Sequence, residues 1–184
     1  MSTRREATRT RLQTAAVELF AEHGYDATTV AQVAARAGVT EMTAFRHFPS
    51  KADLVLDDPY DPVMVDALRR QDTGLPPLVR VARAVREAWR EVPEPAAAHV
   101  RARMRVAAAS PTLRGSLWRN TARTERMLAE QLVADGTPRP IARVAASAAL
   151  AALMTSLLDW ASSEVGELGE AIESALGVVD HGHD

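Results

Sequence analysis

The stretch Thr-Thr-Val-Ala-Gln-Val-Ala-Ala-Arg-Ala-Gly-Val-Thr-Glu-Met-Thr-Ala-Phe-Arg-His-Phe-Pro-Ser-Lys-Ala-Asp-Leu, residues 28–54, decides the fold. Thr28 and Thr29 supply hydroxyls that can cap a helix N-terminus, and small apolar residues then recur at helical spacing. Gly38 follows as a residue that can take a positive φ at a helix C-terminus. This pattern predicts a first short helix at about 29–36 that ends in a tight turn.

A second short helix follows the glycine. Thr40 is its N-cap candidate, Glu41 lies in its positive first turn, and Pro49 ends it, which predicts a helix at about 41–48. Two short helices joined by a glycine turn have the geometry of a helix-turn-helix, whose second helix can enter the major groove of DNA.

At these residues the chain resembles the tetracycline-repressor (TetR) family of one-component transcriptional regulators. The matching pieces, in the family's order and spacing, are Gly24-Tyr25, Thr28-Thr29-Val30, Val33-Ala34, Ala37-Gly38-Val39-Thr40, Thr43, Phe45-Arg46-His47-Phe48 and Ser50-Lys51. A helical hairpin without a DNA role is the alternative for a lone glycine turn, and the whole string from about residue 8 to 54 argues against it. The close resemblance covers under a third of the chain.

Composition limits the possible functions. The 184 residues are 47% apolar, have a net charge of −2 and include no cysteine. The absence of cysteine excludes disulfides, thiolate catalysis and cysteine metal sites. Residues 1–54 carry seven basic and six acidic side chains, so any affinity for nucleic acid must come from a local basic patch.

Two segments bear on localisation. The N-terminus has no apolar run, so we do not expect it to be a signal peptide. Ile141 to Leu158 is almost apolar, but it is mostly alanine and contains Arg143. A buried helix of a soluble, cytoplasmic protein is favoured over the alternative of a membrane span.

The segments on either side of the motif are predicted to be helical. Apolar residues from Leu12 to Phe20 fall on one stripe, which indicates a helix at about 8–22. The arginines before it form either a frayed, solvated end or a basic arm that contacts phosphate or the minor groove. These arginines are Arg4, Arg5, Arg9 and Arg11.

Prolines interrupt the connector after the motif. Pro59 and Pro62 imply a break, with Asp58 or Asp61 as N-cap of a helix that restarts and runs to about Gln71. The neighbouring carboxylates have a second interpretation as ligands of a divalent metal, but capping explains them more simply. We expect a jointed connector and no metal site.

Further turn signals divide the rest of the chain into five helices, at about 77–91, 96–108, 111–134, 138–162 and 165–178. No strand alternation is present. The predicted fold is therefore all-α, with an N-terminal three-helix helix-turn-helix DNA-binding domain at residues 1–54. A C-terminal helical ligand-binding and dimerisation bundle follows at residues 55–184.

The resemblance implies that the second helix of the motif faces a double-stranded DNA operator with Glu41, Met42, Thr43, Arg46 and His47. Arg46 suits guanine and Glu41 can accept from cytosine, so these two are the predicted base readers. Phe45 stands where the family most often has tyrosine, which leaves a ring contact without a phosphate hydrogen bond. The predicted phosphate contacts are Thr29, Thr40, Thr43, His47 and Lys51. Glu41 has an equal alternative as a first-turn helix charge, and Gln32 and Arg36 are more simply solvated helix face.

A single module of this kind reads only a few base pairs, so specificity requires a homodimer on a near-palindrome. The resemblance implies that the last two helices pair across the dimer, with burial inside one subunit as the alternative. The predicted interface residues are Ala145, Ala149, Leu153, Leu157 and Trp160; Ala148 and Ala152 would also permit close approach.

The resemblance also implies a small-molecule effector in the C-terminal bundle, for which an apolar or amphipathic molecule is expected. Candidate lining residues are Trp89, His99, Met104, Trp118 and Met127, and for each of them plain core packing is the alternative. No cofactor is expected. The five histidines accompany no catalytic or metal-binding motif, so an enzyme is not expected. The other alternative is a helical small-molecule-binding protein without DNA binding.

Overall fold

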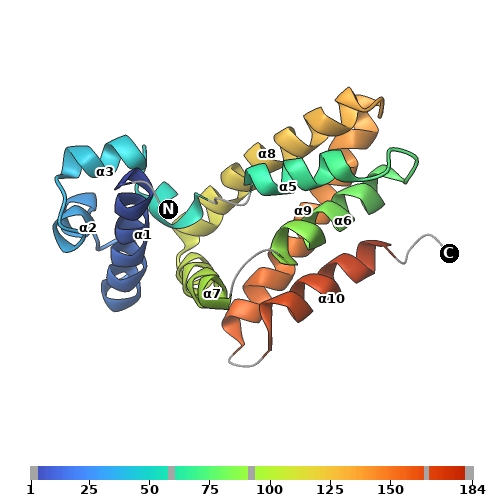
Figure 1. The fold of residues 1–184 in the computed structure, drawn as a ribbon. Coiled ribbons are helices and arrows are strands. Elements are labelled where there is room, and N and C mark those ends of the chain that lie inside the picture. The colour runs from blue at the N-terminus through green and yellow to red at the C-terminus, as the bar shows by residue number, and fades with distance from the viewer. Residues whose placement is uncertain (1–3, 58–60, 91–93, 164–165, 181–184) are drawn as a thin grey trace. The chain divides into compact units, whose positions relative to one another are not determined.

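The computed structural model describes residues 4–57, 61–90, 94–163 and 166–180, and every regular element in these ranges is an α-helix. Figure 1 shows these elements along the chain. The predicted all-α class is confirmed. The chain divides into two compact units, which differ from the division expected from the sequence. The first unit comprises residues 1–57 together with 102–118, and the second comprises 58–101 together with 119–184.

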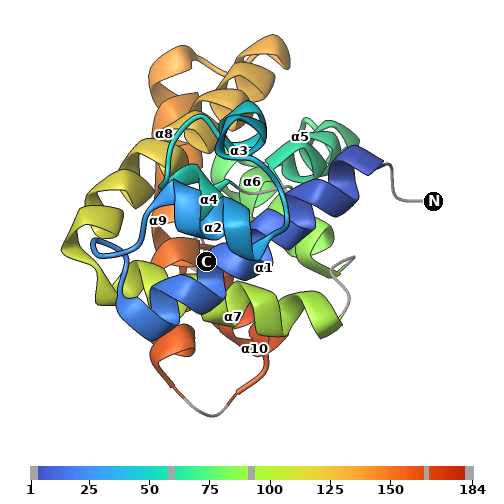
Figure 2. The ribbon, with the colours of Figure 1, turned by 90° about the vertical axis from the view of Figure 1, so that its left-hand side faces the viewer.

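Four helices of the first unit come from the N-terminal part of the chain. They are α1 (Arg4–His23), α2 (Val30–Arg36), α3 (Glu41–His47) and α4 (Asp53–Leu56). Helix α1 contacts α2 and α4, which lie across it in Figure 2. Its stripe of Leu12, Ala16, Leu19 and Phe20 is buried, as the helical spacing predicted, and forms the centre of this unit.

The connector is broken where the prolines predicted. Helix α4 ends at Leu56, and α5 (Asp61–Arg70) starts with Asp61 followed by Pro62. Asp61 is buried, and its Oδ1 accepts a hydrogen bond of 2.8 Å from Thr124 Oγ1. Asp58 and Pro59 lie outside the described residues. Within the described ranges, no three acidic or histidine side chains gather as a metal site.

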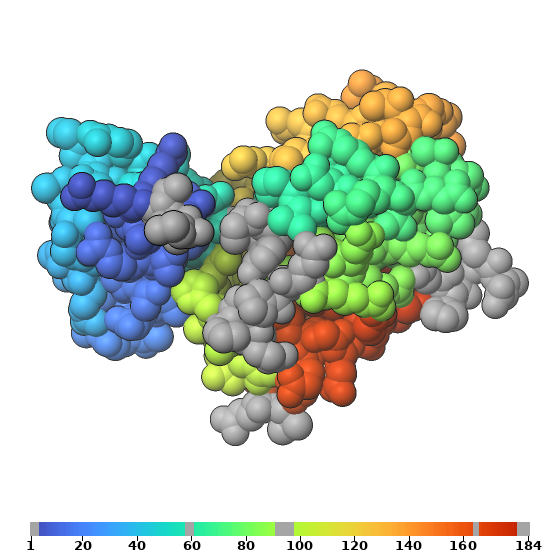
Figure 3. Space-filling model, viewed as in Figure 1, coloured from blue at the N-terminus to red at the C-terminus, as the bar shows by residue number. Residues whose placement is uncertain are grey.

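The second unit is built around α6 (Pro77–Arg90), which packs against three helices. These are α5, α9 (Arg139–Ser162) and α10 (Leu168–Asp180). The α6 side chains Val81, Ala84 and Val85 are fully buried, so α6 is the core helix of this unit. Figure 3 shows α5, α6 and α10 side by side on one face.

Helix α9 is long and apolar enough to cross a membrane by length and composition alone, a test that core helices of soluble proteins also pass. In this structure α9 packs against α6 and α10. Nine of its 24 residues are buried within the chain.

The two remaining helices are shared between the units. They are α7 (Glu94–Ala109) and α8 (Pro111–Ala134). The first unit includes the C-terminal part of α7 and the N-terminal part of α8. Ser110 caps α8, because Ser110 Oγ accepts from the Leu113 amide at 3.2 Å, and Pro111 is the first helical residue.

Candidate nucleic-acid interface

The start of α2 is fixed by a reciprocal cap. Thr29 Oγ1 accepts from the Gln32 amide at 3.2 Å, and Gln32 Oε1 accepts from the Thr29 amide at 2.7 Å. This capping box satisfies two backbone N–H groups that the helix itself leaves free. Thr29 is thus confirmed as an N-cap, and the Gln32 side chain is held at the helix end.

The turn between α2 and α3 is built on Gly38. Its φ is +67°, its amide donates to Ala35 O at 3.1 Å, and the Val39 amide donates to Ala34 O at 2.9 Å. This pair of hydrogen bonds is the Schellman arrangement, which requires a left-handed residue at the position of Gly38. The turn therefore sets the direction in which α3 leaves α2.

Thr40 caps α3 as predicted. Thr40 Oγ1 accepts from the Thr43 amide at 3.2 Å, and the two threonine hydroxyls are 2.9 Å apart. Both hydroxyls predicted to contact phosphate are therefore also engaged at the start of their own helix. The amides of this first turn give the helix N-terminus a partial positive charge.

Helix α3 hides one side and presents the other to solvent. Ala44 is its one buried residue, while Met42 is 73% exposed and Phe45 44% exposed. Glu41 and Arg46 are also exposed and form no hydrogen bond or ion pair within the described ranges. These four residues, hereafter the exposed face of α3, lie one helical turn apart in the pairs 41/45 and 42/46.

His47 lies at the C-terminal end of α3 and is half-buried. Burial lowers the pKa of His47, and the positive charges of Arg5, Arg9 and Arg46 lower it further. Three arginines are thus close enough to act on His47, and they give this end of α3 a local positive charge that the overall charge of the chain does not reveal.

Lys51, the single lysine of the chain, is held by the protein itself. Its Nζ donates to Thr28 O at 2.8 Å and lies 4.2 Å from the centroid of the Tyr25 ring. Lys51 therefore ties the segment before α4 to the turn between α1 and α2. Its predicted phosphate contact stays a prediction.

The N-terminal arginines are part of α1, which begins at Arg4 and not near residue 8. The predicted helix start is therefore corrected, whereas contact of these arginines with phosphate or the minor groove stays a prediction. Arg9 is turned inward: it pairs with Asp57 and its guanidinium lies 4.5 Å from the centroid of the Phe48 ring.

Arg36 is exposed, but it pairs with Glu18 at 3.4 Å and Glu22 at 3.2 Å. Its hydrogen bond to Glu22 raises its pKa. Arg36 and Gln32 are therefore bound to neighbouring protein groups on the surface of this unit.

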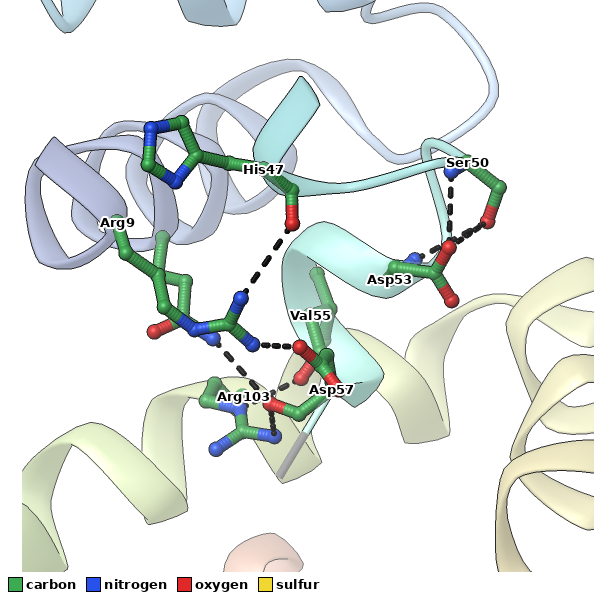
Figure 4. Close-up of polar contacts among 8 residues, drawn as sticks. Arg9, His47, Ser50, Asp53, Val55, Asp57 and Arg103 are labelled. Carbon is green, nitrogen blue, oxygen red and sulfur yellow. Dashed lines mark hydrogen bonds and ion pairs between the residues drawn. The ribbon is translucent and has the colours of Figure 1, made fainter. Parts of the chain in front are cut away.

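The sequence interpretation missed the reciprocal hydrogen bonds between Ser50 and Asp53 at the start of α4. Figure 4 shows the Ser50 amide and hydroxyl donating to Asp53 Oδ2, at 2.8 and 2.7 Å, while the Asp53 amide donates back to Ser50 Oγ. The signal was present as a Ser-x-x-Asp pattern after Pro49. The partners of Arg9 and Asp57 left no such local signal, because they are far apart in the sequence.

The predicted ligand-lining residues do not form one group. Met104 and Trp118 belong to the first unit, whereas Trp89, His99 and Met127 belong to the second. Trp118 is 69% exposed, which corrects its assignment to a pocket lining. Trp89 and Met104 are buried, and His99 and Met127 are half-buried.

The five residues predicted for the dimer interface are all buried within one chain. Ala145, Ala149, Leu153, Leu157 and Trp160 are each at most 7% exposed. They cannot form a surface between subunits, and burial inside one subunit is the alternative that describes them. The exposed apolar residues of α9 are Ile141 and Val144.

The family models and the relative that match this chain agree on one family. Residues 12–57 match the family model described as bacterial regulatory proteins, tetR family, and residues 75–184 match the MftR C-terminal domain. The HTH-type transcriptional regulator TcmR of Streptomyces glaucescens is 31% identical over 186 aligned positions. The alignment covers 92% of this chain and 81% of TcmR.

Solved structures agree in fold. Native NalD of Pseudomonas aeruginosa, the secondary repressor of the MexAB-OprM multidrug efflux pump, is 28% identical with a TM-score of 0.58. The match covers 95% of this chain and 96% of NalD. The fatty acid degradation regulator FadR of Bacillus halodurans has a TM-score of 0.60 at 18% identity, with 96% of each chain covered, and supports the fold alone.

The matched family models and TcmR describe transcriptional regulators, and this family is not one of enzymes. The family resemblance seen in the motif and the expectation of a non-enzymatic regulator are therefore confirmed. The chain belongs to the TetR family of bacterial DNA-binding transcriptional regulators, with a C-terminal segment of the MftR type.

Proposed function

We propose that the chain is an effector-responsive repressor that binds a near-palindromic operator as a homodimer in the bacterial cytoplasm. One observation carries this proposal. The exposed face of α3 presents a cation, a carboxylate and two large apolar side chains to solvent, and neither charge is paired within the described ranges. A helix with such a face fits the major groove, where base edges offer matching hydrogen-bonding groups.

The contacts divide into two kinds. Arg46 reads guanine through its planar fork and Glu41 accepts from a cytosine amino group, while Met42 and Phe45 contact thymine methyl groups or the sugar edge. Phosphates are bound by Thr29, Thr40, Thr43, His47 and Lys51. At Thr29 and Thr40 the helix N-termini support this role, because their amides and hydroxyls lie together.

Selection of bound duplexes from a random library tests DNA reading. The expected result is a near-palindrome for the wild type and loss of preference at two symmetric positions for Arg46→Ala. Arg83→Ala, which removes an exposed arginine from α6 in the second unit, serves as the control and should select the wild-type sequence. Equal selection by all three proteins would remove Arg46 from base reading.

The proposed homodimer uses the exposed side of α9. Ile141 and Val144 are 52% and 69% exposed on a helix whose other side is buried, so they offer an apolar surface to a second copy. The expected mass in solution is twice 19.9 kDa. Val144→Glu should give monomers, whereas Trp118→Glu, at an equally exposed position on α8, should not. A monomeric wild type at micromolar concentration would exclude the dimer.

The proposed effector is an apolar or amphipathic small molecule bound among helices of the second unit. Trp89, His99 and Met127 remain the candidates for its lining, since they lie on α6, α7 and α8 of that unit. A compound that releases the selected operator from the wild type should act less on Met127→Glu. An unchanged response would remove Met127 from the lining.

A further inference from the structure

The C-terminal end of α4 is a meeting point of polar groups from three helices (Figure 4). Arg103 of α7 donates from Nε to Val55 O at 2.5 Å and from Nη2 to Asp57 O at 3.2 Å. Gln13 of α1 donates to the same Asp57 carbonyl at 3.2 Å, and the Asp57 carboxylate pairs with Arg9. The backbone and the side chain of Asp57 are thus both held by protein groups.

Arg9 carries this connection to the DNA-reading helix. Besides its ion pair with Asp57, Arg9 Nη1 donates to His47 O at 3.4 Å, and its guanidinium lies over the Phe48 ring. His47 is the last residue of α3 and Phe48 is its C-cap. One guanidinium therefore joins α1, the C-terminus of α3 and Asp57, the C-cap of α4.

Burial and exposure distinguish this arrangement from ordinary surface pairing. Arg9 and Asp57 are 30% and 24% exposed, and ion pairs near the surface contribute little to the stability of the whole fold. Arg103 is only 4% exposed, so its charge is kept inside the unit. Its partners are carbonyls at a helix C-terminus, where the helix dipole favours a cation.

We infer that Asp57 is a positioning residue for DNA recognition, which acts through Arg9 to fix the C-terminal end of α3, and that Arg103 fixes Asp57 from α7. The inference rests on operator binding by α3. Charge and positioning predict opposite effects on operator binding when the Asp57 carboxylate is removed. If charge alone matters, loss of a carboxylate near DNA strengthens binding; if the carboxylate holds α3 in place, its loss weakens binding.

The test measures the Kd for the selected operator with full-length wild type, Asp57→Asn and Glu18→Gln. Glu18 is a matched control, because it is a paired carboxylate on the same unit whose ion-pair partner, Arg36, lies on α2. We expect Asp57→Asn to weaken operator binding about tenfold, in the range of energies measured for coupled neighbours, while Glu18→Gln binds as well as or better than the wild type. Unchanged or tighter binding by Asp57→Asn would overturn the inference.

Arg9→Lys separates positioning from a direct phosphate contact. Lysine keeps the charge and would preserve a phosphate contact, but it lacks the planar fork that reaches Asp57 and His47 O together. We expect Arg9→Lys to lose about as much affinity as Asp57→Asn, and the double variant to lose no more than either single variant, because both break one connection. Additive losses would show independent roles and contradict the inference.

Arg103→Lys tests the part played by α7. A point cation cannot donate to Val55 O and Asp57 O in the same geometry, so operator affinity should fall while the mass in solution and the circular dichroism spectrum stay at wild-type values. Wild-type affinity for Arg103→Lys would remove α7 from the connection. Failure of the wild type and Glu18→Gln to bind any duplex would instead count against the proposed function.

Discussion

Helices α3 and α9 use their side chains in opposite ways. Helix α3 buries one of its seven residues and presents four to solvent, whereas α9 buries nine of 24 against α6 and α10. Helix α3 is held in place by its ends, through the Thr40 cap, the Gly38 turn and Arg9 at its C-terminus. Helix α9 is held by the packing of its buried side against α6 and α10. A reading helix needs a free face, so its support must come from the termini, while a core helix gains its stability from packing.

The largest change in stability is expected from a substitution on the buried side of α9, the helix that depends on packing. Ala149 is fully buried, so Ala149→Asp places a charge in the core and should cost about 3 kcal/mol or more of unfolding free energy. Ala122→Asp, at an exposed position on α8, should change stability by less than about 0.5 kcal/mol. Urea denaturation measures both. Wild-type stability of Ala149→Asp would contradict the burial of Ala149 in the core.

The next largest effect is expected at the turn before α3. Gly38 has a φ of +67°, so Gly38→Ala puts a Cβ in left-handed backbone and should cost about 1–2 kcal/mol. Its nearest neighbour would be 4.0 Å away, so the cost comes from the backbone and not from a clash. Gly115→Ala, in open space within α8, should stabilise the protein by about 0.5–1 kcal/mol. Thermal unfolding of both variants measures whether the two changes in stability have opposite signs.

A smaller loss is expected at the cap of α3. Thr40→Ala removes the oxygen that accepts from the Thr43 amide and should cost about 1 kcal/mol. Thr155→Ala is the control, because Thr155 lies exposed within α9 and bonds only to Ala151 O, one turn before it. If both substitutions had the same effect on the urea midpoint, α3 would not depend on its N-cap.

The smallest effect concerns pH. Because the folded-state pKa of His47 is lowered, the unfolded chain binds its proton at a higher pH than the folded chain does. The contribution of His47 to stability is therefore complete above about pH 6.5, the ordinary histidine pKa, and is lost as the pH falls toward the lowered folded value. His47→Gln should flatten this part of the urea midpoint against pH. An unchanged profile would assign the dependence to other groups.

The comparison also explains which features were predictable. The ends of α2 and α3 were read correctly from Thr29, Gly38 and Thr40, because a cap and its partner lie within a few residues of each other. The prolines likewise predicted the break before Asp61. The start of α1 was placed too late, since an arginine-rich end carries no apolar stripe and no cap signal was recognised there.

The candidate site was predicted in part. The exposed face of α3 contains residues that the motif had indicated, because helical periodicity assigns Ala44 and Phe48 to the covered side. The role of Arg9 could not be predicted. Its partners His47 and Asp57 are 38 and 48 positions away, and only the folded first unit brings them together.

The sequence by itself determined the all-α class, the helix-turn-helix and its caps, and the family, because these depend on local periodicity, backbone preferences and a string of motif residues. The tertiary structure decided which side of α9 is covered and which arginines of α1 face inward. An alanine-rich helix looks similar on several sides, so its buried side depends on α6 and α10. Likewise, an arginine side chain is stable either in solvent or in an ion pair. Only the position of Asp57 in the folded chain places Arg9 in an ion pair.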